Sequence, residues 1–379
     1  MREVSSKIIS LLIQIADESP EKIALLSENK TLTYKKLLAN VYDLADWLQQ
    51  SRKKSAAVCV ENSFEWVIID LACIVAGVTH IALPEFFSNQ QLKHAINTAR
   101  PDIIISDQIN RLFEIGLKFS SCRKVSDLNV LSLTHNDGNI FNYPNNSKVT
   151  FPSGSISSPQ GVCLSRNLID RVTLGLKDRL QDLSINQHMC VLPLSTLLEN
   201  ISGVYVPLIL GSSVYITPLN NIGFNGGSAV DPNQFIKKLK DIKPDSLILL
   251  PKLLSILVAD TEKTKTLSFE PEFLAVIGST ISPSIINAAR TLGWSVYAGY
   301  TVFENGMFIS INVPGMDRIG SVGKPLPHVK VEIINDEICL SGLHSCAYLD
   351  EVETNDDYFR TGDLGYLDDD GYLYVSDHK

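Results

Sequence analysis

Residues 152–164 read PSGSISSPQGVCL, and most of them are Gly, Ser or Pro. A strand is expected at 148–151, before this stretch, and a helix is expected to begin near Asn167, after it, so the stretch itself is expected to be a loop. Small residues let backbone N–H groups and hydroxyls close around phosphate oxygens. The composition therefore fits a phosphate-binding loop, and taken alone it fits a flexible surface loop equally well.

Strands and helices are expected to alternate on both sides of this loop. Buried apolar runs separated by helical patterns are typical of parallel β–α–β units. One helical pattern covers 64–76, and another follows Thr33, which is its candidate N-cap. The expected strands are 56–60, 79–83, 103–105, 148–151, 189–192, 213–216, 246–250 and 274–277.

The character of the sequence changes beyond about Gly320. Short strands are expected at 329–334 and 337–341, and residues 368–371 (DDDG) have the composition of a tight hairpin turn. The chain therefore divides into two α/β blocks and a small β-rich block. The approximate subdivisions are 1–150, 151–318 and 319–379.

The overall composition excludes several classes of protein. Of the 379 residues, 45% are hydrophobic and 20% are charged, which is too apolar for a disordered chain. The net charge is −9, and nucleic-acid affinity comes mainly from neutralising phosphates with Lys and Arg, so a nucleic-acid partner is not expected. The seven cysteines have no C-x-x-C spacing, which argues against a zinc ribbon or a disulfide framework.

The sequence predicts no membrane span. Its longest apolar stretch, 66–83, is interrupted by Asp70 and His80. Near the N-terminus, apolar positions repeat at helical spacing until Asp17 and Glu18, which is not the pattern of a signal peptide. We therefore expect a cytoplasmic protein.

Four further stretches, together with the loop, follow one another along the chain in the same order as the motifs of a known superfamily. They are 192–200 (LPLSTLLEN), 297–306 (YAGYTVFENG), 319–325 (IGSVGKP) and 358–375 (YFRTGDLGYLDDDGYLYV). Over essentially the whole chain they resemble the adenylate-forming superfamily of acyl- and aryl-CoA synthetases, luciferases and peptide-synthetase adenylation domains. The resemblance is nearest to the acyl-CoA or acyl-carrier-protein synthetase branch.

Individual residues carry this resemblance. The phosphate loop of the family, T-S-G-[ST]-T-G-x-P-K-G, is matched at Ser153, Gly154, Ser155, Pro159 and Gly161. Two further motifs, G-Y-G-x-T-E and Y-x-T-G-D, are matched at Gly299, Tyr300, Glu304, Phe359, Thr361, Gly362 and Asp363.

The resemblance implies a fold and a reaction. The fold is α/β, with two packed β-sheets and flanking helices plus a small distorted β-barrel, as in the large N-terminal domain of the family. The reaction is ATP-dependent activation of a carboxylic acid to an acyl-adenylate, normally followed by transfer to a thiol. The implied cofactors are ATP and Mg²⁺, and the acceptor is either coenzyme A or the phosphopantetheine of an acyl carrier protein.

The resemblance also implies roles for single residues. Glu304 corresponds to the Mg²⁺-linked carboxylate and, with Ser153 of the phosphate loop, would be catalytic. A pocket for the acid would be walled by Thr196, Gly278 and Phe303. The residues expected to bind the nucleotide are Ser153, Gly154, Ser155, Ser157, Gly161, Gly278, Ser279, Tyr300, Thr301 and Asp363.

Three departures from the family pattern leave a second interpretation open. Gln160 replaces the Lys of the phosphate loop, Ile156 and Ser157 replace Thr and Gly, and Phe303 stands where the family has Thr, unless Thr301 takes that place. Loss of a donor aimed at developing charge costs about 10²–10³ in rate. The chain is therefore expected to be either an enzyme with an altered loop or a degenerate domain that binds nucleotide or acyl ligand without efficient turnover.

The substrate class is also predicted from a single stretch. Amino-acid-activating relatives place an Asp in the segment matching 192–200 to pair with the α-ammonium, and the only carboxylate here is Glu199. We therefore expect a fatty or aryl acid without an α-amine, with an amino acid as the alternative.

The family continues with a small domain beyond a hinge that matches Asp377-His378-Lys379, so that domain is expected to be absent here. Cys59, Cys73 and Cys190 lie in apolar contexts and are expected to be inert buried thiols.

Overall fold

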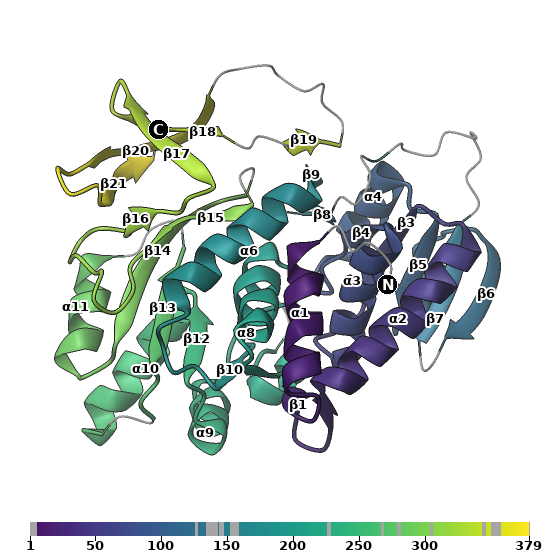
Figure 1. Cartoon of the computed structure of the whole chain (residues 1–379), viewed down its shortest axis with the longest axis horizontal. Coiled ribbons are helices and arrows are strands. Elements are labelled where there is room, and N and C mark those ends of the chain that lie inside the picture. Colours follow the sequence, from purple (N-terminus) through teal and green to yellow (C-terminus); the bar gives the residue numbers. More distant parts are fainter. Residues whose placement is uncertain are drawn as a thin grey trace.

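The computed structural model contains three β-sheets and a set of helices, several of which lie between the two large sheets (Figure 1). The structure describes residues 6–125, 128–133, 143, 148–151, 159–225, 229–266, 269–278, 282–303, 306–342, 346–349 and 358–378. The expected α/β fold with packed sheets is confirmed.

The first large sheet has eight strands and contains the strand that leads into the predicted phosphate loop. Its central strands run parallel: β3 pairs with β4 and β5, and β4 pairs with β8. Every residue of these four strands is buried, because helices cover both faces, and most of their side chains are apolar. The order is β19 (Cys346–Tyr348), β9 (Val162–Leu164), β8 (Lys148–Thr150), β4 (Thr79–Ala82), β3 (Ser55–Cys59), β5 (Ile103–Ser106), β7 (Leu128–Leu133) and β6 (Phe119–Val125).

The second large sheet has nine strands and places the other predicted motifs. Strands β1, β11, β10, β12, β13 and β14 pair in parallel, and β14 continues into an antiparallel pair with β15. The order is β16 (Lys324–Pro325), β15 (Met307–Ile311), β14 (Val296–Val302), β13 (Phe273–Ile277), β12 (Ser246–Leu249), β10 (Gln187–Met189), β11 (Ser213–Tyr215), β1 (Ile23–Leu26) and β2 (Thr31–Thr33).

The β-rich block forms a four-stranded antiparallel sheet beside the end of the second large sheet (Figure 1). Its strands, in spatial order, are β17 (Val329–Ile334), β18 (Glu337–Gly342), β20 (Phe359–Leu367) and β21 (Leu373–His378). Ile338, Leu340 and Leu373 from this sheet share a small core with Tyr300 and Ile309 of β14 and β15. This packing holds the 358–375 motif against the 297–306 motif.

The three sheets cross the expected subdivisions of the sequence. Strands β1 and β2, from the first 150 residues, belong to the sheet built mainly from 187–325, and β19 joins the sheet built mainly from 55–164. The division of the chain at 1–150, 151–318 and 319–379 therefore remains a prediction. Each large sheet combines strands from more than one of these subdivisions.

The helices begin where their N-cap residues predict. The Thr33 side chain accepts a hydrogen bond from the Lys36 amide (3.4 Å), and Ser63 caps the helix expected at 64–76. No helix among the described residues is long and apolar enough to cross a membrane. The helices are α1 (Lys7–Glu18), α2 (Tyr34–Ser51), α3 (Phe64–Ala76), α4 (Asn89–Ala99), α5 (Ile109–Glu114), α6 (Arg166–Leu180), α7 (Leu197–Glu199), the π-helix η1 (Asn200–Tyr205), α8 (Val206–Ile209), the 3₁₀ helix η2 (Leu219–Ile222), α9 (Pro232–Ile242), α10 (Pro251–Thr264) and α11 (Pro283–Thr291).

A fully buried ion pair joins the first large sheet to the π-helix. The Lys148 ammonium on β8 lies 2.6 Å from Asp70 Oδ1 on α3 and donates to Asn200 Oδ1 (2.6 Å) and to the Tyr205 hydroxyl (3.0 Å). Asp70 Oδ2 accepts from the Tyr205 hydroxyl (2.6 Å) and the Asn200 amide (2.8 Å). Burial alone would raise the pKa of Asp70, but Lys148 and the neighbouring donors hold it well below its usual range. The carboxylate therefore remains charged inside the core.

We expect Lys148→Met to lower the free energy of unfolding by about 3–5 kcal/mol, because it leaves the buried Asp70 carboxylate without its cation. Urea denaturation followed by circular dichroism measures this change. The matched control is Lys30→Met, which breaks the exposed Lys30–Glu65 pair (2.7 Å) and should cost about 1 kcal/mol or less. Equal losses in the two variants would contradict this account of the core.

Candidate functional site

The predicted site residues fall into two groups. The described residues include seven of them: Gly161, Thr196, Gly278, Tyr300, Thr301, Phe303 and Asp363. Ser153, Gly154, Ser155, Ile156, Ser157, Ser279 and Glu304 lie outside them, so their roles remain predictions.

Tyr300 and Asp363 meet where the small sheet packs against the second large sheet. The buried Tyr300 hydroxyl donates to Asp363 Oδ2. The other oxygen, Oδ1, lies 2.7 Å from His378 Nδ1 at the end of β21, where Asp363 and His378 are paired residues of adjacent strands. Tyr300 and Asp363, which belong to two separate motifs, thus form one polar cluster with His378, which belongs to the segment matching the hinge. We call Tyr300, Asp363 and His378 the carboxylate cluster.

The backbone before Asp363 fixes the direction of its side chain. Gly362 has φ +78°, a left-handed conformation that favours glycine. The Thr361 hydroxyl donates to the Ile338 carbonyl oxygen (2.8 Å) and accepts from the Asp363 amide (3.0 Å). The Asp363 side chain stays 23% exposed, so its carboxylate can still reach a ligand.

Gly278 and Tyr300 are neighbours at the point where the parallel pairing of β13 with β14 ends, just beyond the carboxyl end of β13. Strands β13 and β14 pair with Ile277 opposite Gly299, so the next residue of each strand is Gly278 or Tyr300. A Cβ at Gly299 would lie 2.6 Å from Ile277 Cδ1, and one at Gly278 would lie 2.9 Å from Pro251 Cδ, so both positions require glycine for packing. Ligands of open α/β sheets bind at the carboxyl ends of the strands, and this edge is therefore the candidate site.

The pairing register of β14 with β15 shifts between Tyr300 and Thr301. The pairing of β14 with β15 is irregular between these two residues, as at a β-bulge, which re-aims side chains near active sites. Tyr300 packs into the core of the small sheet, whereas Phe303 packs against the main core. Phe303 is therefore partly buried, and its role in the wall of a substrate pocket remains a prediction.

The segment containing Thr196 reaches the same region through α7, which packs against β15. The Thr196 hydroxyl donates to the Pro193 carbonyl oxygen (2.7 Å), so it is used within its own turn. The role of Thr196 in binding the acid remains a prediction.

Gly161 has a packing reason to be glycine. A Cβ at this position would lie 2.5 Å from Leu349 Cδ1 and 3.0 Å from Phe151 Cε1. Its carbonyl oxygen accepts from the Leu349 amide (2.9 Å). The neighbouring Gln160, which replaces the family's Lys, is exposed.

Two groups of residues that position the site were missed by the sequence analysis. Thr361 orients Asp363, and its signal was the hydroxyl two residues before a carboxylate in the T-G-D turn. The Lys148–Asp70 pair was visible as a lysine in an apolar strand and an aspartate in an apolar helix. Asp70 served in the sequence only as an argument against a membrane span.

Comparisons with known proteins identify the family of this chain. The family model for AMP-binding enzymes matches residues 12–340. A 2-succinylbenzoate–CoA ligase of Staphylococcus epidermidis is 24% identical over 384 residues, covering 96% of this chain and 76% of the relative. The predicted membership in the adenylate-forming superfamily is thereby confirmed.

Solved structures show the same fold. The o-succinylbenzoate CoA synthetase of Bacillus subtilis, solved in complex with ATP and magnesium ion, has a TM-score of 0.74 at 20% identity, covering 97% of this chain and 79% of that one. The anthranilate CoA ligase AuaEII, solved in complex with anthranoyl-AMP, has a TM-score of 0.79 at 14% identity, covering 100% of this chain and 79% of that one. Because the family model spans most of the sequence and the relatives align over nearly all of it, this chain belongs to the family of AMP-binding enzymes.

Proposed function

We propose that this chain activates a carboxylic acid with ATP to form an acyl-adenylate and passes the acyl group to coenzyme A. The observation that carries the proposal is the carboxylate cluster, which lies beside the carboxyl end of β13. The relatives support it, because the Staphylococcus epidermidis enzyme is a CoA ligase and the Bacillus subtilis enzyme binds ATP and magnesium ion.

The proposed reaction has two steps. An oxygen of the acid attacks the α-phosphorus of ATP, and the bond to pyrophosphate breaks. The thiol sulfur of coenzyme A then attacks the acyl carbon, and AMP leaves. Positioning and electrostatic stabilisation supply most of the rate in such phosphoryl chemistry.

Asp363 fits the ribose of the nucleotide. A carboxylate has two oxygens that can each accept from one of two neighbouring hydroxyls. At present these oxygens are bound by Tyr300 and His378. The His378 side chain is 72% exposed, so it can turn away when a ribose hydroxyl takes its place. The Tyr300 ring lies at the same edge, in line with the adenine role that the family resemblance implies.

Magnesium would neutralise the charge on the phosphate oxygens. A carboxylate together with phosphate oxygens is a suitable donor set for Mg²⁺. Glu304, the residue proposed to hold it, lies outside the described residues, so this assignment depends on the family resemblance.

The geometry of Glu199 supports an acid without an α-amine. This carboxylate, the only one in the 192–200 segment, is fully buried beside His188 and does not reach a surface where a substrate ammonium could meet it. An amino acid is therefore the less favoured substrate. The names of the relatives, which act on succinylbenzoate and anthranilate, favour an aryl acid over the fatty acid considered from the sequence.

Coenzyme A is the proposed acceptor, because the relatives named above are CoA ligases. They lend no support to an acyl carrier protein as the partner. The altered loop at Gln160 keeps one competing function open, which is nucleotide binding without turnover.

We expect Asp363→Ala to raise the KM for ATP about 100-fold, because two charge-assisted hydrogen bonds to the ribose are lost at about 1.5–3 kcal/mol each and part of the loss is recovered by water. Acyl-adenylate formation is measured by hydroxylamine trapping with Mg-ATP. The control is Asp369→Ala in the exposed hairpin turn, whose KM should equal that of the wild type. Full activity in Asp363→Ala would remove Asp363 from the site.

A panel of acids tests the substrate class in the same trapping assay. Substituted benzoates should give hydroxamates at least tenfold faster than long-chain fatty acids or amino acids. Faster turnover of amino acids would refute the interpretation of Glu199. ATP binding measured by calorimetry, without product from any acid, would favour the domain that binds without turnover.

A further inference from the structure

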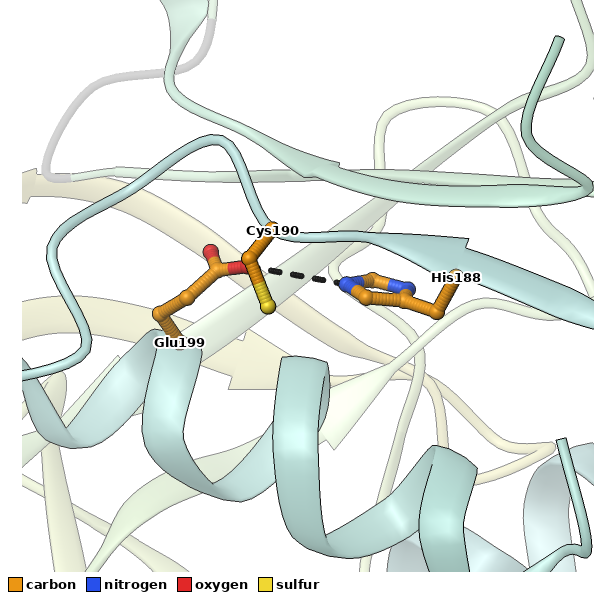
Figure 2. A group of neighbouring side chains, drawn as sticks. All are labelled: His188, Cys190 and Glu199. Atoms are coloured by element: carbon orange, nitrogen blue, oxygen red, sulfur yellow. Dashed lines mark ion pairs between the residues drawn. The ribbon is translucent and has the colours of Figure 1, made fainter. Parts of the chain in front are cut away.

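Three side chains that commonly bind transition metals converge in the core, away from the carboxylate cluster (Figure 2). His188 lies on β10, Cys190 is the first residue after that strand, and Glu199 is the last residue of α7. One ligand atom from each, His188 nitrogen, Cys190 Sγ and Glu199 oxygen, lies within 4.8 Å of the other two. All three residues are at most 1% exposed.

The imidazole is held in one orientation. His188 Nδ1 lies 2.8 Å from the Ser246 hydroxyl on the neighbouring strand β12. The other nitrogen, Nε2, therefore faces Glu199, whose Oε1 is 3.5 Å away, and Figure 2 shows Cys190 sulfur beside this gap. Metal-binding histidines are usually fixed in this way by a hydrogen bond at the nitrogen that does not bind the metal.

Two of the three side chains have atoms without a hydrogen-bond partner among the described residues, whereas the Cys190 thiol donates to the Gly203 carbonyl oxygen (3.5 Å). Across the ranges that the structure describes, neither His188 Nε2 nor either Glu199 carboxylate oxygen has a hydrogen-bond partner. Buried polar groups without partners are costly and rare in native proteins, and an ion is one of the standard explanations for them. Two such atoms facing each other across one gap, His188 Nε2 and Glu199 Oε1, indicate a missing common partner.

A glycine in the π-helix keeps the space between them open. A Cβ at Gly203 would lie 2.5 Å from Glu199 Oε1 and 3.0 Å from His188 Nε2. Cys190 Sγ is 3.5 Å from the Gly203 carbonyl oxygen, so the same residue borders the thiol. π-helices occur frequently at functional sites, and here the π-helix begins at the residue after Glu199.

We propose that His188, Cys190 and Glu199 bind one transition-metal ion of the Zn²⁺ class. Imidazole, thiolate and carboxylate together suit zinc and exclude magnesium, which prefers oxygen ligands. Two tetrahedral ligands about 2.1 Å from zinc lie about 3.4 Å apart, close to the 3.5 Å between Nε2 and Oε1.

The charges balance at this site. A divalent ion bound by a neutral imidazole, one thiolate and one carboxylate gives a site with no net charge, and protons displaced from the ligands pass to solvent. Such a site would connect β10 to α7 and so fix both ends of the segment that carries Thr196, independently of the adenylation chemistry.

Cobalt substitution tests the site in the wild-type chain. After removal of metals with a chelator, one equivalent of Co²⁺ should give the intense visible absorption of a tetrahedral ion and a thiolate-to-cobalt charge-transfer band. Zn²⁺ should displace the cobalt and raise the unfolding temperature, and elemental analysis should find one zinc per chain. Absence of both the band and the temperature shift would overturn the proposal without any variant.

Variants then locate the ion. Cys190→Ser should abolish the charge-transfer band, and Gly203→Ala should prevent binding although all three ligands remain. Ser246→Ala should weaken Zn²⁺ binding about 10–100-fold by releasing His188. The control is Cys73→Ala, another fully buried cysteine, which should bind as the wild type does. Metal that binds Cys190→Ser with unchanged affinity would be an adventitious surface ion and would also overturn the proposal.

Discussion

A lysine ammonium inside the core constrains much of this molecule. Lys148 is 1% exposed and can remain charged only because Asp70, Asn200 and Tyr205 surround it. These partners come from α3 and the π-helix, so the strand entering the predicted phosphate loop has one permitted position relative to the segment after LPLSTLLEN. The two motifs are thus held together by one charge rather than by apolar contacts alone.

The candidate nucleotide site is also assembled from residues that are distant in the sequence. Parallel strands bring Gly278 and Tyr300 to one edge, and the small sheet adds Asp363 from more than sixty residues further along the chain. Glycine is required at Gly278 and Gly299 because neighbouring side chains and backbone leave no room for a Cβ. Family motifs that look like ligand-binding signatures in the sequence are therefore in part packing requirements.

Local elements could be predicted well from the sequence, whereas pairing across long distances could not. The helix over 64–76 has a Ser63 N-cap and a Gly77 end, and both signals are local. The membership of β1 and β2 in the second large sheet has no such signal, since apolar periodicity does not name a partner strand. The roles of Tyr300 and Asp363 came from family motifs, but their contact depends on tertiary packing. Cys190 was expected to be an inert buried thiol because its sequence context is apolar. Its closeness to Glu199 depends on the turn at Pro193, which the spacing in the sequence does not reveal.

Strand β19 has a consequence for how the protein is made. Residues 346–348 supply the edge strand that pairs with β9, at residues 162–164. On the ribosome, β9 is synthesised more than 180 residues before its partner, so its outer edge lacks that partner while those residues are translated. Unpaired strand edges are where chains associate wrongly, and contacts of this sequence separation form slowly. Completion of the first large sheet therefore has to wait until β19 has been synthesised.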